Sequence, residues 1–438
     1  MKTIHSRQVQ GLVKSEYNLQ EIQIIFQFLE DNQSLFFPSL SNGLFPAAVT
    51  SAETQYTCYS SVWVRDNIYV AYSHYILGKT DIAIKTVSSL MSYFKKYKNR
   101  FEQIINREAD SQDPMNRPHI RFNGTSLEEI DQKWAHAQND ALGYFLWFYC
   151  NLVREGKLDL QQEDVEVLAL FALYFQVIHY WEDEDSGHWE EVRKIEASSI
   201  GVVIAGLKSL KRLYLQFDFI SHCCRYENKL VTIHLIDDLL EEGVSALQKI
   251  LPSECIEPES KKRRFDAALL FLIYPLHIVE ENIADQILQD VIGNLQGDYG
   301  IKRYLGDSFW APDYKKKLPP ETRTTDISDD SSLRDSLLTP SGEAQWCIFD
   351  PIISAIFGSK FQKTKQKVYL ERQIEYLNRS LGQLTGEDCE FGGLRCPELY
   401  YSENGKYVPN DSTPLLWTQA NLAVSLKMVE HSLLQHEP

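Results

Sequence analysis

Apolar residues recur at intervals of three and four through most of this chain, and this spacing constrains the fold more than any other feature. Such residues share one face of a helix, whereas a half-buried strand needs strict alternation. The pattern covers ten segments: 67–77, 81–98, 137–155, 163–181, 199–217, 236–251, 284–296, 348–358, 366–384 and 413–434. Convincing strands are few. Together with glycines after several segments and Asp or Thr-Pro before others, the pattern predicts an all-α fold of roughly ten to twelve helices.

Long polar or aromatic-rich loops separate these segments, at 99–133, 182–197, 298–343 and 386–412. Loops of this length in a regular helical chain are usually functional or disordered. The stretch 313–343 has almost no core-forming content, and we expect it to be partly mobile. No Pro/Gly-rich linker or short exact repeat divides the chain, so we interpret residues 1–438 as a single domain of paired helices.

Composition narrows the classes of partner. The 44 Lys and Arg residues stand against 61 Asp and Glu, and the formal charge of −17 repels phosphate backbones and anionic lipid surfaces. No apolar run is long enough to span a bilayer or to form a signal-peptide core. The eight cysteines are scattered, as expected for reduced thiols. We therefore expect a cytoplasmic protein that binds neither nucleic acid nor membrane.

Two helical segments begin in the same way, with a tryptophan followed by polar residues. Trp63, Arg65 and Asp66 precede the first, and Trp134 and Asp140 lie at the start of another. Ordinary helix capping explains an acidic residue at such a position. A rigid Arg–Asp pair that hydrogen-bonds a polyhydroxylated ligand is the alternative interpretation, and the repetition of the arrangement favours it.

The stretch "HWEEVRKIEASSIG", residues 188–201, places Trp189, Glu190 and Glu191 just before a third apolar segment. Acidic residues are favoured near the positive end of a helix, which accounts for them without any chemistry. A carboxylic acid held against an indole in a cleft is also what general-acid catalysis needs, because desolvation raises its pKa. Glu190 is therefore a candidate acid.

Two later stretches bring further candidate residues. "GDYGIKRYLGDSFWAP" contributes Arg303, Asp307 and Trp310, and "FGGLRCPELYY" places Glu398 behind a proline. Hydrolysis of a glycosidic bond needs one carboxylic acid to protonate the leaving oxygen and a second carboxylate to attack carbon or activate water. Glu398 is the candidate for this second group.

The order and wording of these motifs resemble glycoside hydrolase family 15, the glucoamylases, over nearly the whole chain. The succession is WVRDN, KWAHAQNDA, HWEE with ASSIG, DAALLFLIYP, GDYGIKRY, EAQWCIFDPIISAIFG, PELYY and LLWTQANLAVSL. Its wording is most similar to the glucoamylase-like domain of the phosphorylase kinase alpha and beta subunits. The resemblance implies an (α/α)6 barrel of six helical hairpins. Loops at one end would form a funnel for the non-reducing end of an α-glucan.

The resemblance also implies roles for particular residues. By it, Glu190 is the general acid, Glu191 helps to bind sugar and Glu398 is the general base. Arg65 and Asp66 match the pair that grips the terminal glucose. The other implied contacts are Arg303 in the same subsite, Trp189 shaping the pocket of the acid, and stacking surfaces from Trp134, Trp189, Trp310 and Trp417, although Trp417 on an apolar helix fits the core equally well.

We predict an inverting, exo-acting α-glucosidase that releases β-glucose from an α-glucan or α-glucoside without a metal or organic cofactor. Its two carboxyl groups should stand about 6.5–9.5 Å apart across one pocket. The alternative is a non-catalytic protein that binds glucan or regulates, as the kinase-type wording implies. The sequence leaves open the preferred linkage, whether α-1,4, α-1,6 or that of trehalose, the number of subsites and the oligomeric state.

Overall fold

All ten predicted segments are helical in the computed structural model, which describes residues 3–255 and 263–435. They are α3 (Val64–Ile76), α4 (Thr80–Lys96), α6 (Asn139–Arg154), α7 (Gln162–Val177), α8 (Ala197–Gln216), α10 (Ile233–Ile250), α12 (Glu281–Leu295), α15 (Phe349–Thr364), α16 (Lys367–Gly382) and α17 (Leu416–Leu434). The sequence patterns do not predict α2 (Leu19–Asp31) or α5 (Lys98–Ile105). Single-turn helices are α1 (Arg7–Gln10), α9 (Ile220–Cys223), α11 (Leu270–Ile273), α13 (Tyr314–Lys317) and α14 (Ser332–Asp335).

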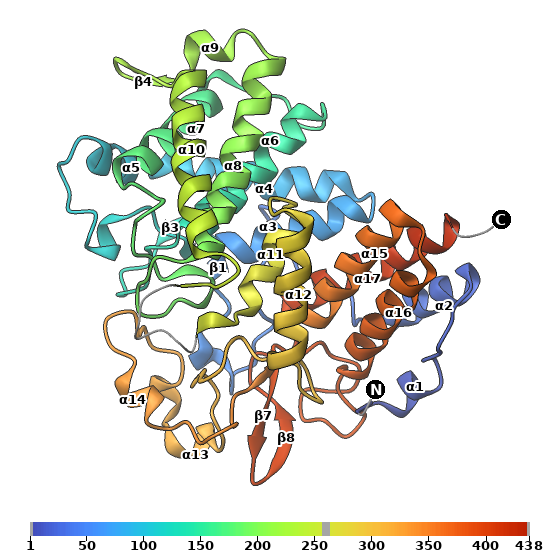
Figure 1. Ribbon diagram of the computed structural model, residues 1–438. Coiled ribbons are helices and arrows are strands. Elements are labelled where there is room, and N and C mark those ends of the chain that lie inside the picture. The colour runs from blue at the N-terminus through green and yellow to red at the C-terminus, as the bar shows by residue number, and fades with distance from the viewer. Residues whose placement is uncertain (1–2, 256–262, 436–438) are drawn as a thin grey trace.

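The helices form an inner and an outer ring, whose arrangement can be followed in Figure 1. In the inner ring α3 contacts α6, and contacts continue through α8, α11, α15 and α17, which returns to α3 and closes the circle. Each inner helix contacts an outer partner: α3 with α4, α6 with α7, α8 with α10, α11 with α12, α15 with α16 and α17 with α2. The first long helix therefore pairs with the last one. The predicted (α/α)6 barrel of six hairpins is confirmed.

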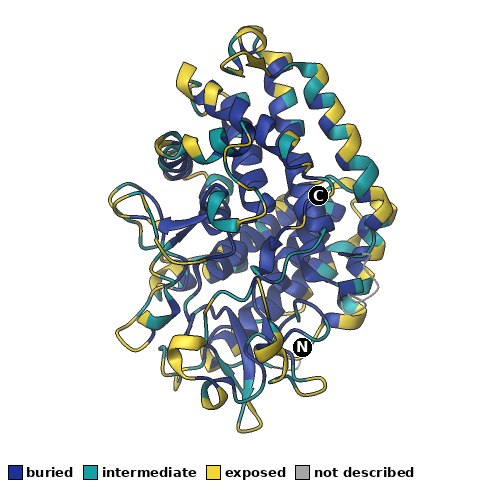
Figure 2. Cartoon of the chain, turned by 90° about the vertical axis from the view of Figure 1, so that its left-hand side faces the viewer, coloured by how far each residue is buried: buried dark blue, intermediate teal, exposed yellow. Residues whose placement is uncertain are grey.

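Helices of the inner ring are buried on nearly all sides, whereas helices of the outer ring are buried on one face. Helix α6 of the inner ring is buried on every side except at Asn151 and Arg154. Outer helix α10 buries a single stripe, which consists of Ile236, Leu239, Gly243, Leu247 and Ile250. A helix that is apolar all round belongs inside a protein, and one with an apolar stripe covers a core. Figure 2 shows the same division, with buried helices at the centre and exposed residues on the outer ones.

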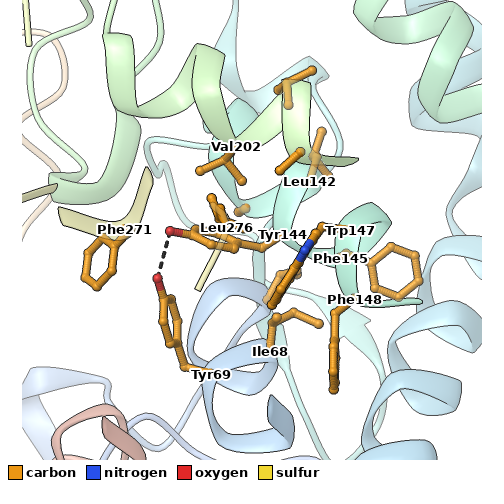
Figure 3. Close-up of a cluster of buried hydrophobic side chains, with 14 of the residues drawn as sticks. Ile68, Tyr69, Leu142, Tyr144, Phe145, Trp147, Phe148, Val202, Phe271 and Leu276 are labelled. Carbon is orange, nitrogen blue, oxygen red and sulfur yellow. Dashed lines mark hydrogen bonds between the residues drawn. The ribbon is translucent and has the colours of Figure 1, made fainter. Parts of the chain in front are cut away.

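The centre of the barrel is packed with aromatic side chains from the inner helices, several of which are labelled in Figure 3. Tyr69 of α3 donates a hydrogen bond of 2.8 Å to Tyr144 of α6. Gly143 lets α6 approach α8 closely, because a Cβ atom there would lie 2.8 Å from the backbone of Val202. The inner helices are thus held at fixed separations, which fixes the positions of their first residues.

Short strands join the loops before the inner helices. The first sheet contains β1 (Val62–Trp63), β2 (Arg121–Asn123) and β3 (Glu128–Glu129), the second contains β6 (Gln345–Trp346), β7 (Leu399–Glu403) and β8 (Lys406–Pro409), and β4 (Arg225–Tyr226) pairs with β5 (Lys229–Leu230). In antiparallel register Trp63 lies opposite Arg121, and Trp346 lies opposite Leu399. These pairings hold Trp63 directly before α3 and bring Trp346 beside the segment that contains Glu398.

Candidate active site

One cavity lies where the inner helices begin, and it collects most of the predicted site residues. It encloses about 800 Å³ of empty space, open solvent at its mouth included. The predicted residues that line it are Arg65, Asp66, Trp134, Trp189, Glu190, Arg303 and Glu398. The chain thus brings Glu190 and Glu398 to one cavity although more than two hundred residues separate them.

Glu190 lies on a strained turn between a short 3-10 helix, Gly187–Trp189, and α8. Its backbone is left-handed, with φ of 56°, a conformation that costs energy in a residue other than glycine. Its Oε1 accepts hydrogen bonds from Trp63 Nε1 at 2.9 Å and Arg65 Nη2 at 3.3 Å. Burial raises the pKa of Glu190, although the charge of Arg65 opposes the shift. The carboxyl group is therefore suited to holding a proton.

Glu398 precedes β7, and its backbone carbonyl accepts a hydrogen bond of 2.9 Å from Cys347, just after β6. Its carboxylate accepts hydrogen bonds from Tyr59 Oη, at 2.9 Å, and from the amide of Asn410. Burial raises the pKa of Glu398 to about 7, while the hydrogen bonds from Asn410 and Tyr59 act in the opposite direction. The group therefore changes charge near neutral pH.

Tyr59 and Trp63 hold the two carboxylates in a defined relation. Their rings lie 5.4 Å apart between centroids, and each ring donates a hydrogen bond to a different carboxylate. Both donors come from one short stretch of chain before α3, so a single rigid segment positions the pair. The sequence analysis missed Tyr59, since an isolated tyrosine in a loop carries no signal until the partner carboxylate is known.

The first turns of α3 and α6 form a buried ion pair at the base of the site. Arg65 Nη1 donates to Asp140 Oδ2 at 2.7 Å and to Gln138 Oε1 at 3.0 Å. Asp66 lines the cavity beside them, and burial raises its pKa to about 7. The polar side chains at the starts of α3 and α6, the two helices that follow a tryptophan, therefore meet at this ion pair. Neither Asp66 nor Asp140 is an N-cap, since Trp63 and Gln138 occupy those positions.

Glu191 lies behind the cavity wall instead of in it. Its carboxylate accepts hydrogen bonds from Arg303 Nη2 at 2.8 Å, from Arg334 Nη2 at 2.5 Å and from Tyr304 Oη. Burial alone would raise the pKa of Glu191, but the surrounding arginines, Arg263 included, hold it well below its usual range. Glu191 lies outside the cavity lining and holds Arg303 and Arg334, which do line the cavity. Its part in sugar binding stays a prediction.

The tryptophans divide between the cavity and the core. Trp134, Trp189 and Trp417 line the cavity, joined by Trp346, to which the sequence analysis assigned no role. Trp310 is 1% exposed, and its ring lies 5.1 Å from Tyr314 and 4.9 Å from Tyr401 between centroids. The predicted stacking of Trp310 on a sugar is therefore corrected, because its ring packs in the core outside the cavity lining.

The stretch 313–343, for which we expected partial mobility, folds against the site. It contains α13 and α14, which lie near the β7–β8 hairpin in Figure 1. Thr324–Ile327 and Arg334 line the cavity. Its polar side chains contact neighbouring loops, as Arg323 does with Tyr56. Composition alone could not distinguish such a segment from a disordered one.

The described part of the chain, residues 3–255 and 263–435, bears on two other expectations, a metal site and a membrane span. There, no group of three or more His, Cys, Asp or Glu side chains is arranged to hold a metal ion. Within the same ranges, every helix is too short or too polar to cross a bilayer. The absence of a cofactor and the cytoplasmic location both stay predictions.

Solved structures with the same architecture are glycosidases and glucoamylases. A wild-type glycosidase matches with a TM-score of 0.61 at 15% identity, covering 97% of this chain and 98% of that one. A glucoamylase from Saccharomycopsis fibuligera matches with a TM-score of 0.58 at 12% identity, covering 96% and 98%. At these identities the likeness shows the fold, which is of the glucoamylase type.

The family model described as glycosyl hydrolases family 15 matches residues 31–309, and the chain belongs to this family. Curated relatives include the phosphorylase b kinase regulatory subunit alpha, liver isoform, of Oryctolagus cuniculus, 27% identical over 416 residues. A probable regulatory subunit alpha of Caenorhabditis elegans is 25% identical over 415 residues. Each match covers 86% of this chain and 31% of the relative, so the chain spans about a third of their length.

Proposed function

We propose that this protein is an inverting, exo-acting α-glucosidase that releases β-glucose from the non-reducing end of an α-glucan or short α-glucoside. The observation that carries the proposal is the presence of Glu190 and Glu398 in one cavity, each with a raised pKa and its own hydrogen-bond donor. Perturbed carboxyl groups in a cleft are typical of acid–base catalysis.

In the proposed reaction Glu190 gives its proton to the glycosidic oxygen as the bond to the anomeric carbon breaks. Glu398 takes a proton from a water molecule, whose oxygen attacks the opposite face of that carbon. The leaving sugar gains the proton of Glu190, and the configuration inverts from α to β in one displacement. Trp63 and Arg65 keep Glu190 oriented throughout, and Tyr59 does the same for Glu398.

The base of the cavity is suited to the hydroxyl groups of a terminal glucose. Asp66 is an acceptor there, and Arg303 presents a guanidinium already fixed by Asp307 and Glu191. The guanidinium lies 4.9 Å from the ring centre of Trp346 and 5.2 Å from that of Trp189. Fixed donors beside aromatic rings match the polar edges and apolar faces of a pyranose, because neither group must be reordered on binding.

The test is an anomer-resolved NMR assay of the purified protein on maltose, isomaltose, trehalose and glycogen. From maltose, isomaltose and glycogen we expect the glucose cut from the non-reducing end to appear as the β anomer. From trehalose we expect equal amounts of α- and β-glucose, because the leaving glucose keeps its α configuration. Glu190→Gln and Glu398→Gln should each abolish release. Glu163→Gln, on the exposed face of α7, is the matched control and should retain full turnover. Release of α-glucose first from glycogen would contradict the inverting mechanism.

A second function is favoured by one observation, the similarity of the chain to regulatory subunits of phosphorylase b kinase. On this reading the barrel binds glucan or a partner without turnover. Calorimetric binding of a glucan with no glucose released from any of the four substrates would support it and overturn the enzymatic proposal. The two carboxylates would then be dispensable, and Glu398→Gln would leave binding unchanged.

A further inference from the structure

Arg121 is a buried arginine of β2 that lies directly opposite Trp63 of β1. It is 2% exposed, and its Nη1 donates a hydrogen bond of 3.2 Å to Gln132 Oε1. Among the residues that the structure describes, its Nε has no hydrogen-bond partner and no carboxylate forms an ion pair with it. Burial removes the water around a charged group, so an unpaired buried cation needs another source of stabilisation.

The other arginine beside the acid is compensated in a way that Arg121 is not. Arg65 Nη1 lies 2.7 Å from Asp140 Oδ2, and although burial alone would lower the pKa of Arg65, its acidic neighbours raise it above the usual value. Burial lowers the pKa of Arg121, and its neighbours, Cys58 and Glu190 among them, oppose the shift only in part. The positive charge of Arg121 is therefore largely uncompensated.

Two indole rings supply the missing stabilisation. The guanidinium carbon of Arg121 lies 4.0 Å from the ring centre of Trp134 and 5.2 Å from that of Trp63. The two indoles meet edge to face, with 6.1 Å between their centroids and 73° between their planes. A cation over an indole is attracted by the electrons of the ring, most strongly where water is excluded. Arg121 thus holds two indoles from different loops in one arrangement.

Both of these indoles belong to the site. Trp63 and Trp134 line the cavity, and Trp63 Nε1 donates the hydrogen bond of 2.9 Å to Glu190 Oε1. The direction of this N–H depends on the orientation of the Trp63 ring, which Arg121 contacts from the neighbouring strand. The orientation of the acid therefore depends on a residue outside the cavity lining.

The charge of Arg121 also acts on Glu190 itself. Burial raises the pKa of Glu190, and the charges of Arg65 and Arg121 oppose the shift. Because Asp140 neutralises Arg65, the positive charge of Arg121 is the less compensated of the two. The titratable and charged groups around Glu190 are Tyr59 before β1, Arg65 and Asp66 of α3, Arg121 of β2, Asp140 of α6 and Glu398 across the cavity.

We propose that Arg121 is a positioning residue for the acid of the site: it fixes the indole N–H that Trp63 gives to Glu190 and adds an unpaired positive charge to the surroundings of that acid. This inference rests on the proposed function, because it concerns the acid of the same site. Without the charge, Glu190 keeps its proton to higher pH. Without the planar guanidinium, the two indoles lose the group that holds them together.

The first experiment follows Glu190 without turnover. Protein labelled with 13C at the glutamate side-chain carboxyl carbons is titrated by NMR, and the signal that disappears in Glu190→Gln belongs to Glu190. Arg121→Met keeps the length of the side chain but removes its charge, so the pKa of Glu190 should rise by about one pH unit. Arg121→Lys keeps the charge and should leave that pKa nearly unchanged.

The second experiment measures glucose release from the substrate that the wild-type protein cleaves. We expect kcat to fall about tenfold in Arg121→Met and about threefold in Arg121→Lys, since an ammonium group cannot stack flat on two indoles. The alkaline limb of the pH profile should move up by about one pH unit in Arg121→Met alone. Arg372→Met is the matched control, because Arg372 of α16 lies 5.4 Å from the ring centre of Phe357 and 5.2 Å from that of Tyr376, outside the cavity lining. It should change neither quantity.

The outcomes separate this inference from the proposed function. A protein that releases no glucose overturns the proposed function, and the NMR titration then decides the inference by itself. A pKa of Glu190 that rises in Arg121→Met and stays in place in Arg121→Lys supports the inference. A pKa that stays in place in Arg121→Met, or that rises equally in Arg121→Lys, overturns it and leaves Arg121 a structural residue of the sheet. If Arg121→Met does not fold, Arg121→Gln, which is uncharged and keeps a hydrogen-bond donor, replaces it with the same expected result.

Discussion

Glu190 and Glu191 are neighbours in the sequence, yet they lie in opposite electrostatic environments. Glu190 lines the cavity, is 18% exposed in its side chain, and has a pKa that burial raises. Glu191 lies within an arginine cluster formed by Arg303, Arg334 and Arg263, which lowers its pKa. The environment of Glu190 favours its protonated form, and the environment of Glu191 favours its charged form.

The backbone conformation directs the two neighbouring carboxyl groups into different environments. The left-handed turn at Glu190 directs its side chain to the cavity, while that of Glu191 is directed to the arginines behind the wall. Strained backbone at a functional site is maintained when surrounding contacts determine it, and here Trp63 and Arg65 supply them. Replacing each of the two glutamates by glutamine should therefore affect different properties, catalysis at Glu190 and stability at Glu191.

The largest effect is expected from Glu190→Gln in a glucose-release assay. The amide preserves shape but has no transferable proton, so kcat should fall by about 10³-fold, within the range for general acids. The urea midpoint should stay within error of the parent, because no buried cation loses its main partner. Turnover within a few-fold of the wild type would show that Glu190 is not the acid.

Glu191→Gln should instead act on stability. Arg303 and Arg334 would lose the buried charge that compensates them, and breaking a buried ion pair from one side costs about 3–5 kcal/mol. Equilibrium urea unfolding measures this loss, with Glu163→Gln on the exposed face of α7 as the control. A variant as stable as the parent would mean that the arginine cluster needs no anion, which would end the distinction drawn between the two neighbours.

The pH dependence of kcat/KM should report the pKa of Glu398. Burial raises the pKa of Glu398 to about 7. The acid limb of a bell-shaped profile, where the base Glu398 gains a proton and activity falls, should therefore lie near neutral pH. The hydrogen bond from Asn410 stabilises the charged form of Glu398, so Asn410→Ala should raise that pKa and move the limb up by about one pH unit. Asn294→Ala, at an exposed position of α12, is the control. A limb that stays in place would exclude Glu398 as its source.

The smallest expected effect is that of Trp63→Phe. The indole N–H stabilises the charged form of Glu190, so its removal should raise the pKa of Glu190. The alkaline limb of the profile, where Glu190 loses its proton, should then move up by about half a pH unit. The position of Glu191 should be unaffected. The urea midpoint should fall modestly, because Trp63 is buried and the smaller ring leaves a cavity. A shift of that limb to lower pH would contradict the orientation of the hydrogen bond described here.

Most of the helices could be predicted from the sequence pattern, and the six-hairpin barrel was implied by the resemblance of the motifs to glycoside hydrolase family 15. The helix signal is local, since apolar residues three or four positions apart share a helix face wherever the rest of the chain lies. The same approach failed for α2 and α5, and it did not predict the single-turn helix α11. Most of the predicted residues that line the cavity occur in motifs, at the starts of α3 and α6, in the turn before α8 and in the loops that contain Arg303 and Glu398.

Only the tertiary structure decided which members of those motifs reach the cavity. The sequence favoured Trp310 as a site residue and left Trp417 between site and core, but Trp310 packs against Tyr401 in the core while Trp417 lines the site. Tyr59 and Glu398 meet across more than three hundred residues, and Arg334 reaches Glu191 from a segment with no core pattern. Such contacts depend on how distant loops pack at the end of a closed ring, and no local spacing records them.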